Sequence, residues 1–277
     1  MTATAFNETM PSTLHSTPPT QKVVAEQFRA VGIALRTEAY FFIGALLLLG
    51  AVIVGSTIQQ LQKQPAFDPG FTFGAAGAIP IIFLALFIPF GVWRTEDPSR
   101  RSYHWTMPVA RGPHTIIKLL SGWAWTMIAS VAYVAFILVL AAILSGISGG
   151  ANRVARGPGW EWVVAFTAPT LCYLLISVAV VGSDHAWRWI IGVAVSFWIL
   201  MAVFAAFHMP DATQLLRSLW GGTYGLEAAL VGTTGRYVAG PAGAVSATSP
   251  GSWLVAMPFW IIGAAIATTI LAYRHRD

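Results

Sequence analysis

The polar stretch from Arg94 to Lys118 concentrates side chains that could bind a partner or do chemistry. It holds five of the sixteen Lys and Arg residues of the chain. Its middle predicts a short helix that carries aromatic residues and ends near prolines. Aromatic side chains and Arg are the usual anchors of protein interfaces, so the stretch favours contact with something other than lipid. Its charged, aromatic and proline residues between the two ends are Glu96, Asp97, Pro98, Arg100, Arg101, Tyr103, His104, Trp105, Pro108, Arg111, Pro113 and His114.

Patterns typical of catalysis are missing elsewhere. The sequence contains no GxxxxGK[ST] phosphate-binding loop and no HExxH metal motif among its six histidines. Its single cysteine, Cys172, lies in an apolar run and excludes a multi-cysteine metal site. The adjacent Asp184 and His185 are interpreted as a solvated turn. We therefore expect no metal, no cofactor and no enzymatic activity on this chain.

The composition is that of a membrane protein. Of its 277 residues, 56% are hydrophobic and only 10% are charged, with a mean hydropathy of +0.66. Soluble domains carry about 25% charged residues. The net charge of +5 comes from loops and tails, so it indicates topology and contact with lipid headgroups. Nucleic acid is not an expected partner, because no polar domain gathers the charge.

Residues 1–20 are rich in Ser, Thr and Pro and are expected to form a disordered cytoplasmic tail. Residues 21–277 are expected to form one membrane domain. At its start, Val24, Phe28, Val31 and Leu35 recur at helical spacing among charged residues. This pattern predicts either a helix lying in the membrane interface or an extension of the first spanning helix.

Six apolar stretches follow, each near the ~20 residues needed to cross a bilayer. None of them contains Lys, Arg, Asp or Glu, which disfavours ion-coupled transport. Backbone groups in lipid must be satisfied within the segment, so the stretches must be helices. The expected fold is an all-α integral membrane protein. The six expected spans are 39–58, 71–93, 119–145, 163–181, 189–207 and 253–273.

The basic residues predict the orientation of these spans. With both termini in the cytoplasm, eleven of the sixteen Lys and Arg residues lie inside, as the positive-inside rule requires. The stretch 94–118 is then cytoplasmic. The five basic residues expected outside are Lys63, Arg153, Arg156, Arg217 and Arg236.

The third outside segment, 208–252, is expected to form a broken helix before the last span. Asp211 and Gln214 suggest a capping box at its start. Three glycines then interrupt the helix, and Leu226–Val231 resumes it. The small and polar residues after Gly232 predict a loop.

Together these features resemble the permease subunits of type-2 ATP-binding-cassette exporters. In that family an acid at the inner end of the second span precedes a PxSR…K-like run. Here Glu96 is followed by Pro108-Val109-Ala110-Arg111 and, seven residues later, by Lys118, with Ala110 in place of the usual serine. The six-span layout and the broken outer helix share the resemblance.

The resemblance implies that Arg100–Trp105 is a coupling helix that docks into a separate P-loop ATPase subunit. Glu96, Pro108, Arg111 and Lys118 would order the surrounding loop. ATP and Mg would then be bound by that partner. A second permease subunit, identical or not, would complete an export path lined by the first, second and fifth spans. The implied location is the bacterial cytoplasmic membrane, and the aromatic and aliphatic lining favours an amphipathic or lipid-like substrate.

Three alternatives stand beside this interpretation. The basic groups of 94–118 could meet only lipid phosphates. The chain could be a membrane anchor or assembly protein that transports nothing. It could also be an integral membrane enzyme that modifies lipid, although the sequence shows no polar cluster for that chemistry.

Overall fold

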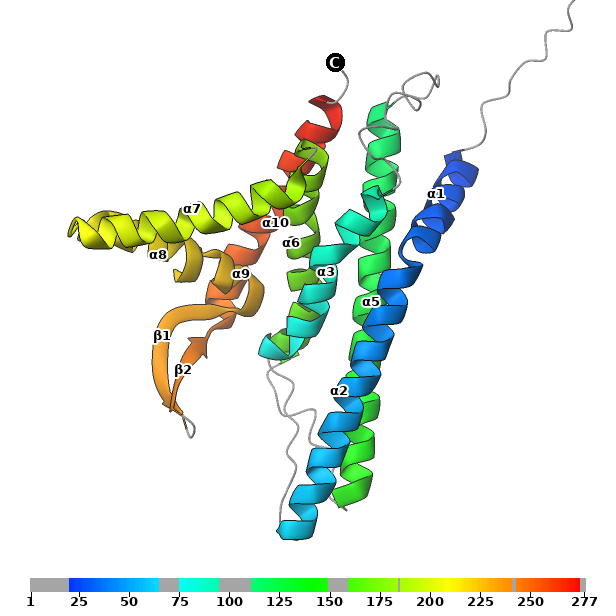
Figure 1. The fold of residues 1–277 in the computed structure, drawn as a ribbon, viewed down its shortest axis with the longest axis vertical. Helices are drawn as coiled ribbons and strands as arrows, with labels where there is room; N and C mark the ends of the chain where they lie inside the picture. The colour runs from blue at the N-terminus through cyan, green and yellow to red at the C-terminus, as the bar shows by residue number, and fades with distance from the viewer. Residues whose placement is uncertain are drawn as a thin grey trace, which may run out of the picture.

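The computed structural model describes residues 20–64, 75–94, 111–148, 159–183, 185–240 and 243–274. Most of these residues are helical, and one β-hairpin is the exception (Figure 1). In chain order the elements are α1 (Thr20–Ala34), α2 (Arg36–Lys63), the 3₁₀ helix η1 (Ala75–Ala78), α3 (Ile79–Trp93), α5 (Arg111–Ser148), α6 (Gly159–Gly182), α7 (Ala186–Ala206), α8 (Pro210–Gly221), α9 (Leu226–Val231), β1 (Thr233–Gly240), β2 (Gly243–Thr248) and α10 (Pro250–Arg274).

Within the described ranges, five helices are long and apolar enough to cross a membrane, namely α2, α5, α6, α7 and α10. This confirms the class of an integral membrane protein built from helices. The remaining expected span, 71–93, is represented by η1 and the 15-residue helix α3, and its first four residues lie outside the described ranges.

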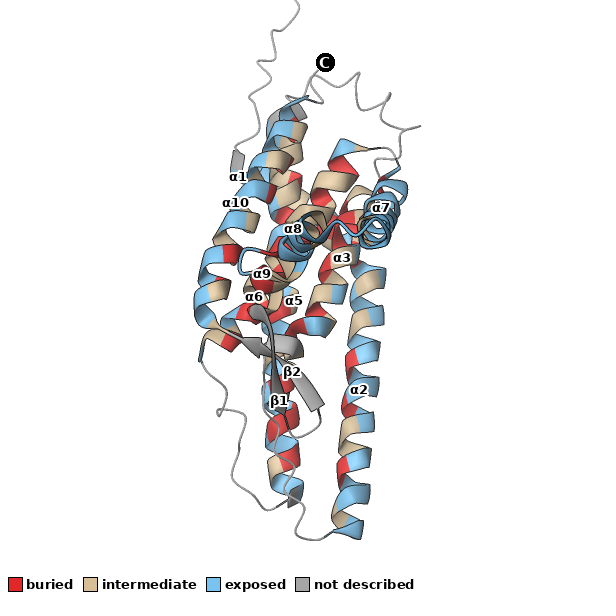
Figure 2. Ribbon diagram, turned by 90° about the vertical axis from the view of Figure 1, so that its left-hand side faces the viewer, coloured by how far each residue is buried: buried red, intermediate tan, exposed pale blue. Residues whose placement is uncertain are grey.

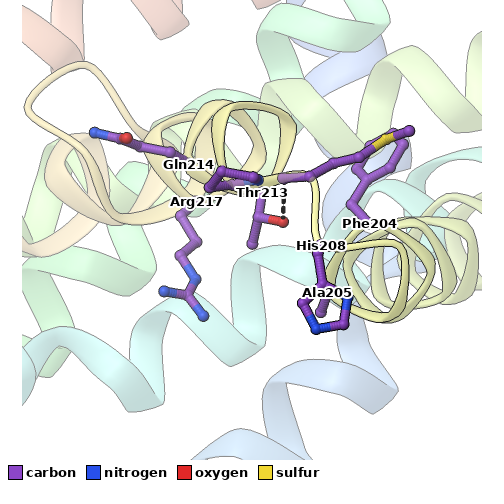
Figure 3. A pocket seen from close by; sticks show the side chains of 8 residues that line it. Phe204, Ala205, His208, Thr213, Gln214 and Arg217 are labelled. Carbon is purple, nitrogen blue, oxygen red and sulfur yellow. Dashed lines mark hydrogen bonds between the residues drawn. The ribbon is translucent and has the colours of Figure 1, made fainter.

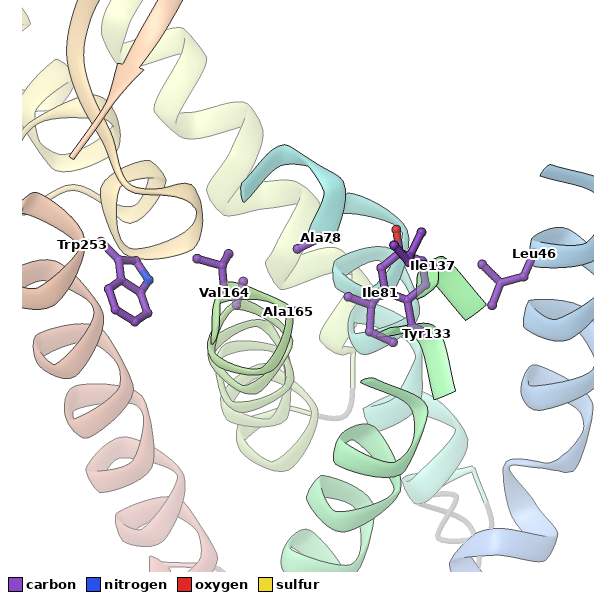
Figure 4. Close-up of a cluster of buried hydrophobic side chains, with 9 residues drawn as sticks. Leu46, Ala78, Ile81, Tyr133, Ile137, Val164, Ala165 and Trp253 are labelled. Atoms are coloured by element: carbon purple, nitrogen blue, oxygen red, sulfur yellow. The ribbon is translucent and has the colours of Figure 1, made fainter. Parts of the chain in front are cut away.

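α6 is the central helix and is more buried than any other candidate span. It contacts α3, α5, α7 and α10. Small residues on α6, such as Ala165 and Ala168, are fully buried and let the neighbouring helices approach closely. Figure 4 shows this core, to which η1, α2, α3, α5, α6 and α10 contribute side chains. The labelled core residues are Leu46, Ala78, Ile81, Tyr133, Ile137, Val164, Ala165 and Trp253.

Several buried Ser and Thr hydroxyl groups in these helices are satisfied within their own helix. Thr126, Ser177 and Thr268 each donate a hydrogen bond to the carbonyl oxygen four residues earlier. Such bonds are needed where no water reaches the group. The apolar helices can therefore carry polar residues without leaving buried donors free at these positions.

α1 and α2 form a bent but continuous helical path. Leu35 separates them, yet its N–H bonds to the Val31 carbonyl and its own carbonyl accepts from Ala39 N–H, each at 2.9 Å. α1 contacts α5 more extensively than it contacts α2. α1 is thus a distinct helix that also continues into the first candidate span, and its place at the membrane interface stays a prediction.

α5 begins at Arg111, eight residues before the expected start of the third span at Leu119. Pro113 was expected to close a short helix, but it lies in the first turn of α5. A proline is tolerated there because first-turn N–H groups have no partner within the helix. With 38 residues, α5 is about 57 Å long at about 1.5 Å per residue, so it extends well beyond a hydrocarbon layer of about 30 Å.

α7 does not run parallel to the other candidate spans. It lies across the bundle in Figure 1, and Figure 2, turned by 90°, shows it nearly end-on. None of its best apolar window is buried. Its first turn is held by Trp187, whose ring stacks on Phe90 of α3 with centroids 4.5 Å apart. The expected helix at 189–207 therefore exists, but its direction differs from that of its neighbours.

The segment after α7 corrects two expectations. α8 begins at Pro210 with Met209 as its N-cap and no side-chain cap, so the predicted capping box at Asp211 and Gln214 is wrong. Proline at the first helical position replaces it as the start signal. The break after Gly221 and the restart at Leu226 are confirmed.

The stretch after Gly232 is not the expected loop but an antiparallel hairpin. β1 and β2 pair from Tyr237↔Ser246 to Gly240↔Gly243, with an irregularity between Thr233 and Tyr237. Gly232 has a φ of +71°, a left-handed conformation that suits glycine at the end of α9. The fold is thus predominantly helical, with one small β element.

Candidate functional site

The structure describes the two ends of the stretch 94–118. Arg94 follows α3 directly, and α5 starts at Arg111, whose side chain lies outside the described part. Seven predicted site residues also lie outside the described ranges, so the coupling helix stays a prediction. These residues are Glu96, Arg100, Arg101, Tyr103, His104, Trp105 and Pro108.

Lys118 is a buried charge at the start of α5. Only 4% of its surface is exposed, and its Nζ lies 4.7 Å from the centroid of the Trp93 ring. An ammonium group over an indole face is attracted by the ring, and the attraction strengthens when water is excluded. Lys118 therefore binds the first part of α5 to the last residue of α3.

Glu38 and Arg94 form an ion pair on the other side of the α3 end. Arg94 Nη1 lies 3.6 Å from Glu38 Oε1, with Arg94 65% exposed and Glu38 21% exposed. So exposed a pair contributes little to stability. The second carboxylate oxygen of Glu38 is buried and has no hydrogen-bond partner within the described part of the chain. The pair joins the residue that directly follows α3 to the first turn of α2.

Gly91 allows this close packing. A Cβ at that position would lie 2.6 Å from Leu35 Cδ2 and 3.4 Å from the Glu38 carboxyl carbon. A larger residue there would force the Leu35 side chain, or α3 itself, to shift. We name Glu38, Gly91, Trp93, Arg94 and Lys118 the loop-anchor cluster.

α1 forms a platform beside the loop-anchor cluster. Phe28 of α1 stacks on Trp125 of α5 with centroids 4.9 Å apart, and Trp125 Nε1–H donates to the Phe28 carbonyl at 3.1 Å. Val31 and Leu35 are buried in a cluster with Ile88, Val92 and Tyr173. Parts of α1, α3, α5 and α6 therefore meet near the described ends of the stretch 94–118.

The sequence predicts a site role for Lys118 but not for Glu38 or Trp93. No partner is predicted for Glu38, although it is the last acid before a long charge-free run. An acid at that border needs a nearby cation or water. That requirement was the available signal, but the identity of its partner depends on how the helices pack.

The described residues contain no group of three or more His, Cys, Asp or Glu side chains that could hold a metal ion. They do contain a pocket at the turn between α7 and α8, lined by residues of 204–217. It is separate in sequence from the loop-anchor cluster. Comparisons with protein-family models, with curated proteins and with solved structures gave no match.

Proposed function

We propose that this chain is the membrane-spanning subunit of an ATP-binding-cassette exporter and that loop 94–118 docks a separate ATPase subunit. The observation that carries the proposal is the loop-anchor cluster. It ties both ends of a basic, aromatic loop to the helical bundle through Lys118 on Trp93 and Arg94 beside Glu38. The proposal rests equally on the sequence resemblance of Glu96, Pro108–Arg111 and Lys118.

The contacts suit a loop that transmits force. If the ends of the loop were flexible, a force applied by a partner would move the loop without moving the helices. Here the buried Lys118–Trp93 contact joins α3 to α5, and both helices pack on α6. Close-packed interiors are stiff, so a shift of the loop would move α3 and α5 as rigid elements.

The proposed permease has six spans, with η1 and α3 together forming the second. The four residues of η1 rise about 8 Å and the 15 residues of α3 about 22 Å. Their sum matches a hydrocarbon thickness of about 30 Å. α1 would lie at the cytoplasmic interface, and α8 and α9 would form the broken outer segment.

A second permease subunit completes the proposed assembly. α7 is apolar and unburied along its best window, and α2 is also largely exposed. Both belong to the spans that the resemblance assigns to the path between two permeases. A path with such aliphatic and aromatic walls favours an amphipathic or lipid-like substrate over a small ion.

Co-purification tests the proposal. We expect a P-loop ATPase to be recovered with the tagged chain after mild detergent extraction. The double substitution Tyr103→Ala/Trp105→Ala should abolish that recovery and leave membrane insertion unchanged, because it removes the predicted aromatic anchors. Tyr224→Ala/Trp220→Ala is the matched control, since it removes the same two residue types from exposed positions in the proposed outer segment.

Recovery of no ATPase with the unaltered chain would contradict the exporter assignment. Equal recovery with the Tyr103/Trp105 variant would contradict the docking role of 100–105. Equal loss in both double variants would indicate a general defect of assembly and would also remove support for a specific dock.

A further inference from the structure

The turn between α7 and α8 forms a pocket that the exporter proposal does not use. Its volume is about 530 Å³, within the size range of small-molecule sites. Its polar lining comes from His208, Thr213, Gln214 and Arg217, and its apolar lining includes Phe204 and Met209. None of its lining side chains is acidic. The balance of charge in the pocket therefore favours an anion.

Two polar side chains, Arg217 and His208, share one side of the pocket. Figure 3 shows the Arg217 guanidinium of α8 and the His208 ring of the α7–α8 turn on the same side, with Thr213 between them. Both Arg217 and His208 are exposed, so a ligand can reach them. A guanidinium binds phosphate through two parallel N–H donors, which makes Arg the favoured residue for that group.

The backbone holds His208 in a special conformation. Its φ is +50°, and within the described residues it is the one non-glycine position with a positive φ. Its Nδ1 lies 3.1 Å from the Ala206 carbonyl oxygen. When Nδ1 carries the proton it donates to this carbonyl oxygen, and Nε2 is then left for a ligand.

The surroundings of the pocket indicate an amphiphile. α8 carries exposed Leu215, Leu219 and Trp220 together with the polar Gln214 and Arg217, so the helix is amphipathic. Helices of this kind lie at the boundary between headgroups and acyl chains. The pocket, with its cation and its apolar wall, would then sit at the depth of lipid phosphates.

From these observations we propose that the α7–α8 pocket binds a phosphate group carried by an anionic amphiphile, with Arg217 as its cationic contact and His208 as a second polar contact. Phe204 and Met209 would contact the apolar part next to the phosphate. The same chemistry would accept free phosphate, although the pocket volume and its apolar wall suit a headgroup better. This site is independent of the ATPase dock.

Native mass spectrometry of the full chain in a neutral detergent tests this site. The probes are dioleoylphosphatidylglycerol and, as the net-neutral lipid with the same acyl chains, dioleoylphosphatidylcholine. Inorganic phosphate is titrated separately by calorimetry. We expect preferential binding of phosphatidylglycerol and a loss of at least about tenfold in its affinity for Arg217→Gln, because charge-assisted bonds to phosphate are lost. Arg217→Lys should retain most of the affinity.

Two further variants separate the pocket from general effects. His208→Asn removes the imidazole but keeps a residue that tolerates a left-handed backbone, so the turn should persist; we expect it to weaken phosphatidylglycerol binding. Arg188→Gln removes the same charge from an exposed position at the other end of α7. It should leave the affinity unchanged.

Each outcome decides the proposal. Binding of phosphatidylglycerol that depends on Arg217, with or without binding of inorganic phosphate, supports a headgroup site. Arg217-dependent binding of inorganic phosphate alone supports the phosphate site but identifies free phosphate as its ligand. No binding of either probe, or equal effects of Arg217→Gln and Arg188→Gln, overturns the proposal.

Discussion

Single residues determine how closely α1 packs on α5, next to the loop-anchor cluster. Gly32 is the clearest case, because a Cβ there would lie 2.5 Å from a carbon of the Trp125 ring. The ring cannot yield freely, since it stacks on Phe28 and donates to the Phe28 carbonyl. A glycine at position 32 therefore allows α1 and α5 to lie this close together.

We predict that Gly32→Ala destabilises the protein. Overpacking of a tight contact costs about 1–3 kcal/mol, which outweighs the gain in helix propensity of up to about 1 kcal/mol. Gly44→Ala is the matched control, because a Cβ at Gly44 meets no atom within 4 Å. Thermal unfolding in detergent should show a lower transition temperature for Gly32→Ala and an unchanged or higher one for Gly44→Ala. Equal transition temperatures would contradict the contact.

At the residue scale, the sequence allowed part of the candidate sites to be predicted. Lys118 is predicted as a site residue by the resemblance of the run that it closes, and it is buried at the start of α5. His208 and Arg217 were interpreted only as a junction and as an outside charge. Both residues line one pocket because His208 has a positive φ and because α8 packs beside α7. No spacing of residues in the sequence predicts that α8 packs beside α7.

At the scale of elements, the helices were predictable and the hairpin was not. Charge-free runs of about 20 residues force helices in lipid, so α2, α5, α6, α7 and α10 follow from composition alone. Residues 233–248 are rich in Gly, Ala, Ser and Thr, and only some of these types favour strands. Neither strand shows a clear alternation of apolar and polar residues, so the pattern used to predict strands does not identify them.

The register of the hairpin gives a prediction at this scale. Val238 and Val245 are directly paired, as are Ala239 and Ala244. Directly opposite residues have Cα atoms about 4.5–5.5 Å apart, within the range that a disulfide spans. We expect Val238→Cys/Val245→Cys to form an intrachain disulfide on mild oxidation, detected by mass spectrometry of the digested chain.

A shift of one residue provides the control for that crosslink. In Val238→Cys/Ala244→Cys the two side chains belong to opposite faces of the hairpin, because the side-chain period of a strand is two. The native Cys172 is buried and should remain reduced in both variants. Efficient crosslinking of the shifted pair, or none in the direct pair, would show that the register is wrong.

At the scale of the whole molecule, composition and charge predicted a helical membrane protein but not how its helices pack. α7 shows why. A helix that is apolar on every side has no amphipathic stripe to indicate which face is buried, so its direction relative to α6 leaves no trace in the sequence. α6 could be recognised as a span, yet its central position depends on contacts with α3, α5 and α10.

The orientation of the molecule in the membrane underlies the proposed function, because only a cytoplasmic loop 94–118 can meet an ATPase. The distribution of Lys and Arg predicts that α1 faces the cytoplasm and that the end of α2 faces outward.

Lys22 on α1 and Gln64 after α2 are both exposed, so cysteines at these positions can report the orientation. In intact cells, we expect a membrane-impermeant maleimide to label Gln64→Cys at once and Lys22→Cys only after the membrane is opened. The unaltered chain should stay unlabelled, since Cys172 is buried. The opposite pattern would place loop 94–118 outside and would exclude the ATPase dock, whereas the α7–α8 phosphate site would be unaffected in its chemistry and would only change leaflet.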